Sequence, residues 1–290
     1  MQKVLDAQLE EWLTGISDEI FFWKHYMKNK GGGRFRKGFE DVVRKNRKFL
    51  LEEELLSYDE NTEINFIDVG SGPFSRCGFL TDRVKMNCIA LDPLADIYVI
   101  LKKKYNLENG INLRTGFVEL LDKQFLENTF DLVHMSNALD HSFNPIIGIS
   151  QLLYICKVGG KVILRHNENE AEAEGYQGLH QWNLSTNHKE HNFMIWRHEE
   201  RYNISKLFQD YAEISVKADL LEKQFTRVEL VKKKEISIPT NELYDNMLFK
   251  IYPFLLRTIY EDVNRSDIGI KPYIKRIKRE MIRREQRRKM

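Results

Sequence analysis

The chain has 290 residues, 42% hydrophobic and 30% charged, with a net charge of +2. These proportions are typical of a soluble globular protein with room for one core of about 200 residues. No apolar stretch approaches the ~20 residues of a membrane span, and no signal-like start is seen, which argues against a membrane-spanning protein. The cysteines lack the spacing of a disulfide framework or of a metal site, which argues against a small disulfide-stabilised protein. We therefore expect a cytoplasmic, soluble protein.

The first 60 residues predict helices. Ser17 has the residue type of an N-cap for a helix over 18–29, which the glycines at 31–33 would end. A second helix is predicted over 38–57, because its apolar residues recur at helical spacing.

The segment FIDVGSGP, residues 66–73, joins an apolar run to a Gly-x-Gly turn. A second apolar run, CIALD, ends at Asp92, twenty-two residues after Gly70. This layout predicts a strand, a tight turn, a helix and a second strand with a terminal carboxylate. Glycines allow close approach of backbone to a ligand, and a carboxylate accepts hydrogen bonds from a vicinal diol. We therefore predict a site for a nucleoside-bearing cofactor.

Apolar runs and helical segments alternate from residue 64 to about 235. This alternation predicts a three-layer α/β domain with a mainly parallel sheet, whose last two strands form an antiparallel pair at one edge. Helices are predicted notably over 145–156 and 203–210. The seven predicted strands are 64–69, 87–91, 111–114, 130–135, 160–165, 212–218 and 226–232.

The pattern breaks between residues 166 and 200, which are polar and rich in His and Trp. A connection of this length is usually functional or disordered. The aromatic residues and the short apolar run 193–196 favour an ordered lid or hairpin.

The order of these segments resembles the class I S-adenosylmethionine-dependent methyltransferases over about residues 62–235. FIDVGSGP is similar to the family's first motif, ALDP to the second, FDLVHMSNALDH to the segment around the fourth strand, and KVGGKV to the start of the fifth. A nicotinamide enzyme would typically have a third glycine where this chain has Ser75 and Arg76. The resemblance implies a Rossmann-like α/β/α fold and S-adenosyl-L-methionine as the cofactor, with S-adenosyl-L-homocysteine as its product.

The resemblance also implies roles for single residues. Asp92 would hold the ribose hydroxyls, with Pro93 beside the adenine. Phe117 stands where an aspartate is common in the family, so it is expected to cover the adenine face, while Val118 offers its backbone amide. The predicted cofactor residues are Asp68, Gly70, Ser71, Gly72, Asp92, Pro93, Phe117, Val118 and Asn137.

An N-terminal helix often roofs the cofactor in this family. The aromatic residues Phe21, Phe22, Trp23 and Tyr26 are predicted chiefly to pack that helix. Arg34 would then be within reach of the methionine carboxylate.

Histidine suits the removal of a hydroxyl proton near neutral pH. His141 follows the fourth strand and His180 lies in the insertion, so these two are the catalytic candidates; a structural role stays open for each. His134, inside a strand, is predicted to be satisfied within the fold. No metal site is predicted: the acidic residues Glu168, Glu170 and Glu172 beside His166 are interpreted as a loop.

Two basic segments flank a mildly acidic body. Residues 24–48 and residues 271–290 each carry ten Lys or Arg against two acidic residues. The second segment, Lys271 to Met290, combines dense positive charge with a narrow apolar stripe, which predicts binding to an anionic membrane surface or polymer. A peripheral location at the inner membrane face follows, whereas nucleic acid is not favoured because no recognition motif is seen.

We predict an O-methyltransferase acting on a sugar, sugar nucleotide or surface polysaccharide with a histidine base. The segment EGYQGLHQWN resembles methyltransferases of bacterial surface-polysaccharide and sugar-tailoring pathways. Three alternatives stay open: N- or carboxyl-methylation of a small metabolite, RNA methylation, and a cofactor-binding scaffold without catalysis. The predicted units are a helical cap (1–60), the methyltransferase domain (61–238, with 166–200 as a substrate lid) and a helical extension (239–290).

Overall fold

The structure is a computed structural model that describes residues 2–32, 36–44, 47–107, 109–222 and 224–238, together with 255, 257, 258 and 261. The predicted basic C-terminal helix and Arg34 lie outside these residues.

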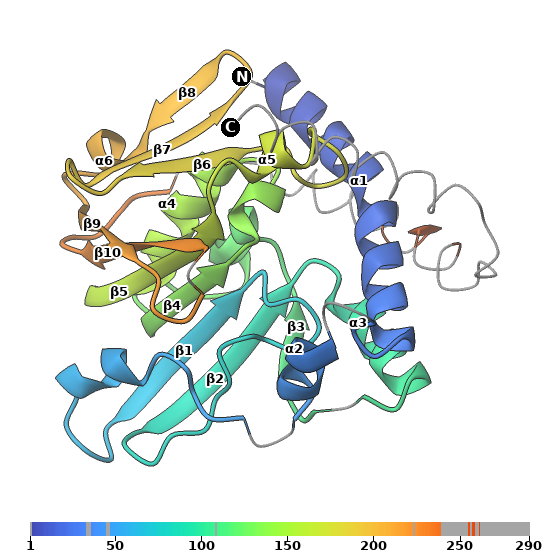
Figure 1. Cartoon of the computed structure of the whole chain (residues 1–290). Helices are drawn as coiled ribbons and strands as arrows, with labels where there is room; N and C mark the ends of the chain where they lie inside the picture. Colours follow the sequence, from blue (N-terminus) through green and yellow to red (C-terminus); the bar gives the residue numbers. More distant parts are fainter. Residues whose placement is uncertain are drawn as a thin grey trace.

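A seven-stranded sheet forms the centre of the molecule, in the order β3-β2-β1-β4-β5-β10-β9 (Figure 1). The first five strands of the chain run parallel, whereas β10 is antiparallel to both of its neighbours. The predicted mainly parallel sheet with an antiparallel pair at one edge is thus confirmed. The strands are β1 (Glu63–Val69), β2 (Lys85–Asp92), β3 (Leu113–Thr115), β4 (Phe130–Ser136), β5 (Cys156–Asn167), β9 (Ala212–Ala218) and β10 (Phe225–Lys232).

The strand order reverses at β1, which pairs with β2 on one side and β4 on the other. In open α/β sheets, ligands bind outside the carboxyl ends of the strands at such a switch point. The chain leaves β1 after Val69, β2 after Asp92 and β4 after Ser136, so these three strand ends border the expected site.

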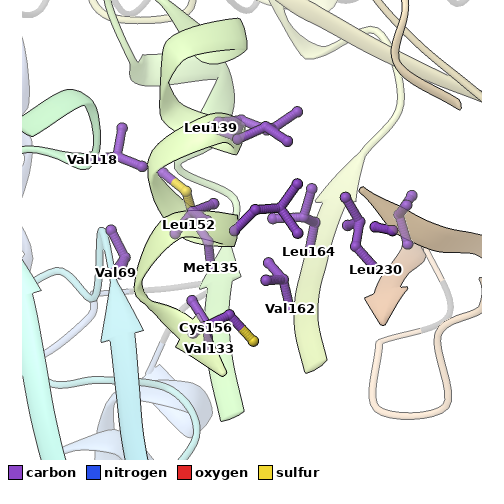
Figure 2. Close-up of a cluster of buried hydrophobic side chains, with 14 of the residues drawn as sticks. Val69, Val118, Val133, Met135, Leu139, Leu152, Cys156, Val162, Leu164 and Leu230 are labelled. Atoms are coloured by element: carbon purple, nitrogen blue, oxygen red, sulfur yellow. The ribbon is translucent and has the colours of Figure 1, made fainter. Parts of the chain in front are cut away.

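The main core lies between one face of the sheet and α4. Figure 2 shows Val69, Met135 and Leu164, one from each of β1, β4 and β5, beside Leu152 of α4. The opposite face is covered by the segment from Phe49 to Leu55. The described helices are α1 (Gln2–Lys28), α2 (Arg36–Val42), η2 (Glu52–Ser57), α3 (Ala95–Lys104), η3 (Val118–Lys123), η4 (Leu139–His141), α4 (Pro145–Ile155), α5 (Glu170–Ala173) and α6 (Ile204–Leu207).

The N-terminal helices differ from the prediction. Helix α1 runs through Ser17, so the predicted N-cap there is wrong; the helix extends towards the N-terminus because Trp12, Ile16 and Ile20 lie on one buried stripe. The predicted helix over 38–57 is also wrong, since α2 ends at Val42. The chain after it is extended, because Phe49 and Leu51 insert into the core and the backbone of Lys48 pairs with that of Leu80.

The predicted helix between the first two strands is absent from the described residues 70–84, which form turns and bends. Pro73 removes a backbone donor, Ser75 and Gly78 adopt positive φ angles, and Gly78 packs tightly against the backbone of Lys48. The turn after β1 therefore does not open a helix.

The insertion forms an ordered element, as predicted. Three antiparallel strands, β6 (Asn183–Asn187), β7 (Asn192–Arg197) and β8 (Glu200–Asn203), make a small sheet beside the carboxyl ends of the central strands (Figure 1). Phe193 and Ile195 alternate along β7 and are wholly buried in the main core. Helix α1 runs from this small sheet to α3 (Figure 1).

Within the described residues, no helix combines the length and hydropathy needed to cross a bilayer.

Candidate active site

The glycine turn after β1 is shaped by two positive φ angles, 65° at Gly70 and 60° at Gly72. A Cβ atom at Gly70 would lie 2.5 Å from the Cβ of Ala138, which follows β4. Only glycine combines this backbone conformation with so close an approach. The turn is therefore packed directly against the segment that leads to η4.

Asp92 lies at the end of β2 and faces this turn. Its Oδ2 accepts a hydrogen bond from the Gly72 amide and its Oδ1 one from the Leu94 amide, both at 2.9 Å. Burial raises the pKa of Asp92 to about 7, although these two hydrogen bonds oppose the rise. Each carboxylate oxygen keeps lone-pair capacity for a further donor, as recognition of a ribose diol requires.

Helix α1 covers the turn from the other side. A Cβ atom at Gly72 would lie 3.1 Å from the ring of Trp23, and the Trp23 indole donates a 2.6 Å hydrogen bond to Glu19. A cavity of about 60 Å³ adjoins the turn here. It is lined by Phe22, Trp23, Tyr26, Val42, Ser71, Phe74, Ser75 and Arg76.

The other predicted cofactor residues have different surroundings. Asp68 is buried and holds the base of the turn, since it accepts hydrogen bonds from His134 Nδ1 at 2.7 Å and Ser75 Oγ at 2.5 Å. The prediction that the His134 side chain finds a hydrogen-bond partner inside the fold is thus confirmed. Ser71 lines the cavity, and Pro93 is half-buried beside Asp92.

Phe117 is buried against Trp12 of α1, with ring centroids 5.6 Å apart. Val118 begins η3 and packs against Gly148 of α4. Asn137 has φ 49°, and its amide donates a 2.7 Å hydrogen bond to the Arg165 carbonyl. These residues border the same edge of the sheet, but Phe117 and Val118 are also packed in hydrophobic clusters of the core.

These features fit an S-adenosyl-L-methionine cofactor. Gly70 and Gly72 carry no Cβ atom, the buried Asp92 is aimed at the turn, and aromatic side chains of α1 form the facing wall. Asp92 would hold the ribose, and the turn from Gly70 to Gly72 would lie along the methionine portion.

A cluster formed by Asp140, His141 and His180 lies beside this turn. His180 Nδ1 is 2.8 Å from Asp140 Oδ2 and 3.0 Å from His141 Nε2, which in turn is 3.4 Å from the same Asp140 oxygen. Asp140 is 1% exposed, whereas the histidine side chains are 19% and 18% exposed. Both predicted catalytic residues are thus brought together across 39 positions of sequence. We shall call these three residues the His–Asp cluster.

Charges within the His–Asp cluster shift its pKa values. Burial alone would raise the pKa of Asp140 and lower that of His180. The neighbouring imidazoles outweigh burial at Asp140 and lower its pKa, while the Asp140 hydrogen bond and charge raise the pKa of His180.

Backbone contacts hold the two halves of the cluster together. The carbonyl of Asp140 accepts hydrogen bonds from the amides of Gln181 and Trp182, which ties the insertion to η4. The Trp12 indole donates to the His141 carbonyl at 2.7 Å. Helix α1 thus touches both the glycine turn and the His–Asp cluster.

Asp140 and Trp12 are the residues that sequence reasoning missed. Asp140 stands directly before His141 in the segment LDH, and an acidic residue next to a candidate base was the available signal. Nothing in the sequence pairs Trp12 with His141, because 129 positions separate them.

The acidic residues after β5 do not converge on one point. Glu168 accepts hydrogen bonds from Thr186 and Thr226, and Glu170 from Asn167. Among the described residues, these glutamates and His166 do not come together as a group that could hold a metal ion. His166 is buried, which lowers its pKa to about 4, and stacks on Phe193.

Residues 67–164 match a family model described as a methyltransferase domain. The chain matches none of the curated proteins. Among solved structures it is similar to a chain from a Haloferax volcanii complex of a methyltransferase activator with a methyltransferase, at 15% identity and TM-score 0.49, covering 74% of this chain and 98% of that one. It is also similar to a methyltransferase from Aquifex aeolicus, at 15% identity and TM-score 0.40, covering 67% of this chain and 95% of that one. A third similar structure is a methyltransferase from Mesorhizobium loti, at 13% identity and TM-score 0.39, covering 62% of this chain and 95% of that one.

Proposed function

We propose that this chain is an S-adenosyl-L-methionine-dependent methyltransferase and that its methyl acceptor is a hydroxyl group of a carbohydrate. The observation that carries the proposal is the His–Asp cluster beside the glycine turn. Gly70 packs on Ala138, and Asp140 follows two residues later, so cofactor and cluster share one edge of the sheet.

A neutral hydroxyl is a weak nucleophile, so its proton must leave as the new bond forms. A carboxylate acceptor would not need such a group, and an unprotonated amine would need it less. The cofactor supplies an activated methyl group on its sulfonium. The protein's part is to hold the donor through Asp92 and the glycine turn, and to receive the acceptor's proton at His141 or His180 of the cluster.

Alignment of the donor, the acceptor and the catalytic groups accounts for much of the rate acceleration in such an in-line transfer. Asp140 orients His180 through the 2.8 Å contact, and Trp12 fixes the backbone of His141. Trp12 of α1 and the backbone of the insertion contact the cluster and shield part of it from water. The polar residues of the insertion support a carbohydrate acceptor, because amide and carboxylate side chains hydrogen-bond to hydroxyls and aromatic rings stack on sugar faces.

A screen for S-adenosylhomocysteine release tests this proposal. Sugar nucleotides and glycans are compared with their deoxy analogues, and with amines and carboxylic acids of similar size. We expect release with a hydroxylated sugar and loss of release with the analogue that lacks one hydroxyl. Release with amines or carboxylic acids alone would contradict the proposal.

We further propose that residues 271–290 hold the enzyme at an anionic membrane surface, on the basis of their charge in the sequence. Deletion of these residues should abolish co-sedimentation with anionic vesicles and leave cofactor affinity unchanged. Vesicle binding that survives the deletion would refute this role.

A further inference from the structure

We propose that the His–Asp cluster binds a divalent transition-metal ion. The inference rests on the proposed function and refines how the cluster activates a hydroxyl. Asp140 Oδ2, His141 Nε2 and His180 Nδ1 form a closed triangle with sides of 2.8, 3.0 and 3.4 Å. One carboxylate oxygen and two imidazole nitrogens are a ligand set typical of such metals.

The triangle has the size that a metal would impose. With metal–ligand bonds of about 2.1 Å, neighbouring ligand atoms lie ~3.0 Å apart in an octahedral site and ~3.4 Å apart in a tetrahedral one. The three measured sides span this range. An ion about 2.1 Å from all three atoms would sit ~1 Å out of their plane, so the three ligands would occupy one side of its coordination sphere.

Hydrogen bonds alone satisfy the cluster poorly. His180 Nδ1 faces both Asp140 and His141 but carries at most one hydrogen, which it can direct to only one of them. The other oxygen of Asp140, Oδ1, is buried and has no hydrogen-bond partner among the described residues. An unsatisfied oxygen on a wholly buried carboxylate is costly, and a cation beside the carboxylate offsets that cost.

The site is open enough for catalysis. Three protein ligands that leave a position free are the pattern of a catalytic metal, whereas structural sites are closed. The histidine side chains are about one-fifth exposed, so an ion and an acceptor can reach them. A hydroxyl bound at the free position loses its proton more readily; the proton passes to solvent water, which reaches the partly exposed site, and both histidines then act as ligands rather than as the base. Two imidazoles favour Zn²⁺, Mn²⁺, Fe²⁺ or Co²⁺ over Mg²⁺ and Ca²⁺.

Co²⁺ is the probe for this proposal, added to untagged, full-length protein that has been stripped with a chelator. We expect one ion per chain by calorimetry, with weak visible absorption bands from nitrogen and oxygen ligands. His141→Ala, His180→Ala and the isosteric Asp140→Asn should each weaken binding by about a hundredfold or more, since loss of an outer partner alone costs about 10–100-fold. Circular dichroism and thermal melts check that each variant is folded.

The matched control is His188→Ala, because His188 is an exposed histidine of the same insertion, and its affinity should equal that of the wild type. A second buried group, Asp68 with Cys77 and His134, provides an internal check. Binding there would produce an intense near-ultraviolet thiolate band that Cys77→Ala removes. That band, a wild type that binds no Co²⁺, or binding that survives all three ligand substitutions would each overturn the proposal.

Activity separates this inference from the proposed function. If chelator-treated, metal-free enzyme methylates a hydroxyl at the full rate, the role of the metal in activating the hydroxyl is refuted while the hydroxyl acceptor stands. If the ion binds at the cluster but only amines or carboxylic acids are methylated, the acceptor is refuted while the metal site stands.

Discussion

The two halves of the candidate site are built in different ways. The cofactor half consists of backbone amides and one carboxylate, supplied by two adjacent parallel strands and their turns. The acceptor half consists of side chains from η4 and from the insertion, joined by backbone contacts to Asp140 and by α1. The first half follows from the sheet register, whereas the second depends on where the insertion is docked.

This difference indicates which changes each half should tolerate. A substitution in the cofactor half should alter affinity for the donor with smaller effects on the chemical step. A substitution in the acceptor half should alter turnover and leave donor affinity unchanged. The following predictions test that separation, from the largest effect to the smallest.

Loss of His180 should have the largest effect. In His180→Ala, turnover should fall by about a hundredfold or more, because the cluster that promotes loss of the hydroxyl proton is broken. Affinity for S-adenosylhomocysteine, measured by calorimetry, should stay within about twofold of the wild type. A parallel loss of affinity would show that the two halves are not separable.

Asp92→Ala should show the opposite pattern. Removal of this carboxylate should weaken cofactor binding by about 1–3 kcal/mol, because charge-assisted hydrogen bonds to the ribose are lost. Calorimetry with S-adenosylhomocysteine measures the change. Unchanged affinity would mean that the ribose lies elsewhere.

Gly15 tests the contact between α1 and the loop that leads to His180. A Cβ atom here would lie 2.6 Å from the backbone of Gly178, two residues before His180. Gly15→Ala should therefore lower the free energy of unfolding by about 1–3 kcal/mol and also reduce turnover, since α1 is pushed away from the loop.

The matched control is Gly38→Ala in α2, where a Cβ atom meets nothing within 4 Å. This change should be neutral or should stabilise the protein by up to ~1 kcal/mol, because alanine favours helix. Chemical denaturation measures both variants. Equal effects of the two substitutions would contradict a specific contact between α1 and the loop.

The pH dependence of cofactor binding should be the smallest effect. Asp92 has a pKa of about 7, so its ionised fraction grows between pH 6 and 8, and cofactor affinity should rise by at most about tenfold. The stability of the free protein should change in the opposite direction. The pKa of Asp92 in the folded protein lies above its unfolded value of about 3.9. The contribution of Asp92 to the free energy of unfolding is therefore fully present at low pH and is lost as the pH rises through about 7.

Asp92→Asn removes the titration and should flatten both profiles. Calorimetry and thermal melts at pH 6, 7 and 8 provide the measurements. If the pH dependence persists in this variant, another group causes it.

The strands and the cofactor half were predictable from the sequence. Each predicted strand lies within two residues of its observed start except 160–165, which belongs to a longer β5 that begins at Cys156. Apolar runs of this kind have few alternatives to burial in a sheet. Asp92 meets Gly72 because the parallel register aligns the ends of β1 and β2.

Helix boundaries were less predictable. Ser17 resembles an N-cap, yet burial of Trp12 and Ile16 extends α1 past it. The segment after Val42 has a helical apolar pattern, yet Phe49 and Leu51 are buried by an extended chain. In both places tertiary packing overrides a local preference worth under about 1 kcal/mol per residue.

The sequence by itself determined the class of fold and the glycine turn with the acidic residue that faces it, because these depend on short-range pattern and on strand alignment. Only the tertiary structure decided that Asp140, His141 and His180 share one point and that Trp12 and Gly15 of α1 secure them. The reason is that no periodicity specifies contacts across 39 or 129 positions; they arise when the small sheet and α1 bury their apolar faces at the same edge of the central sheet.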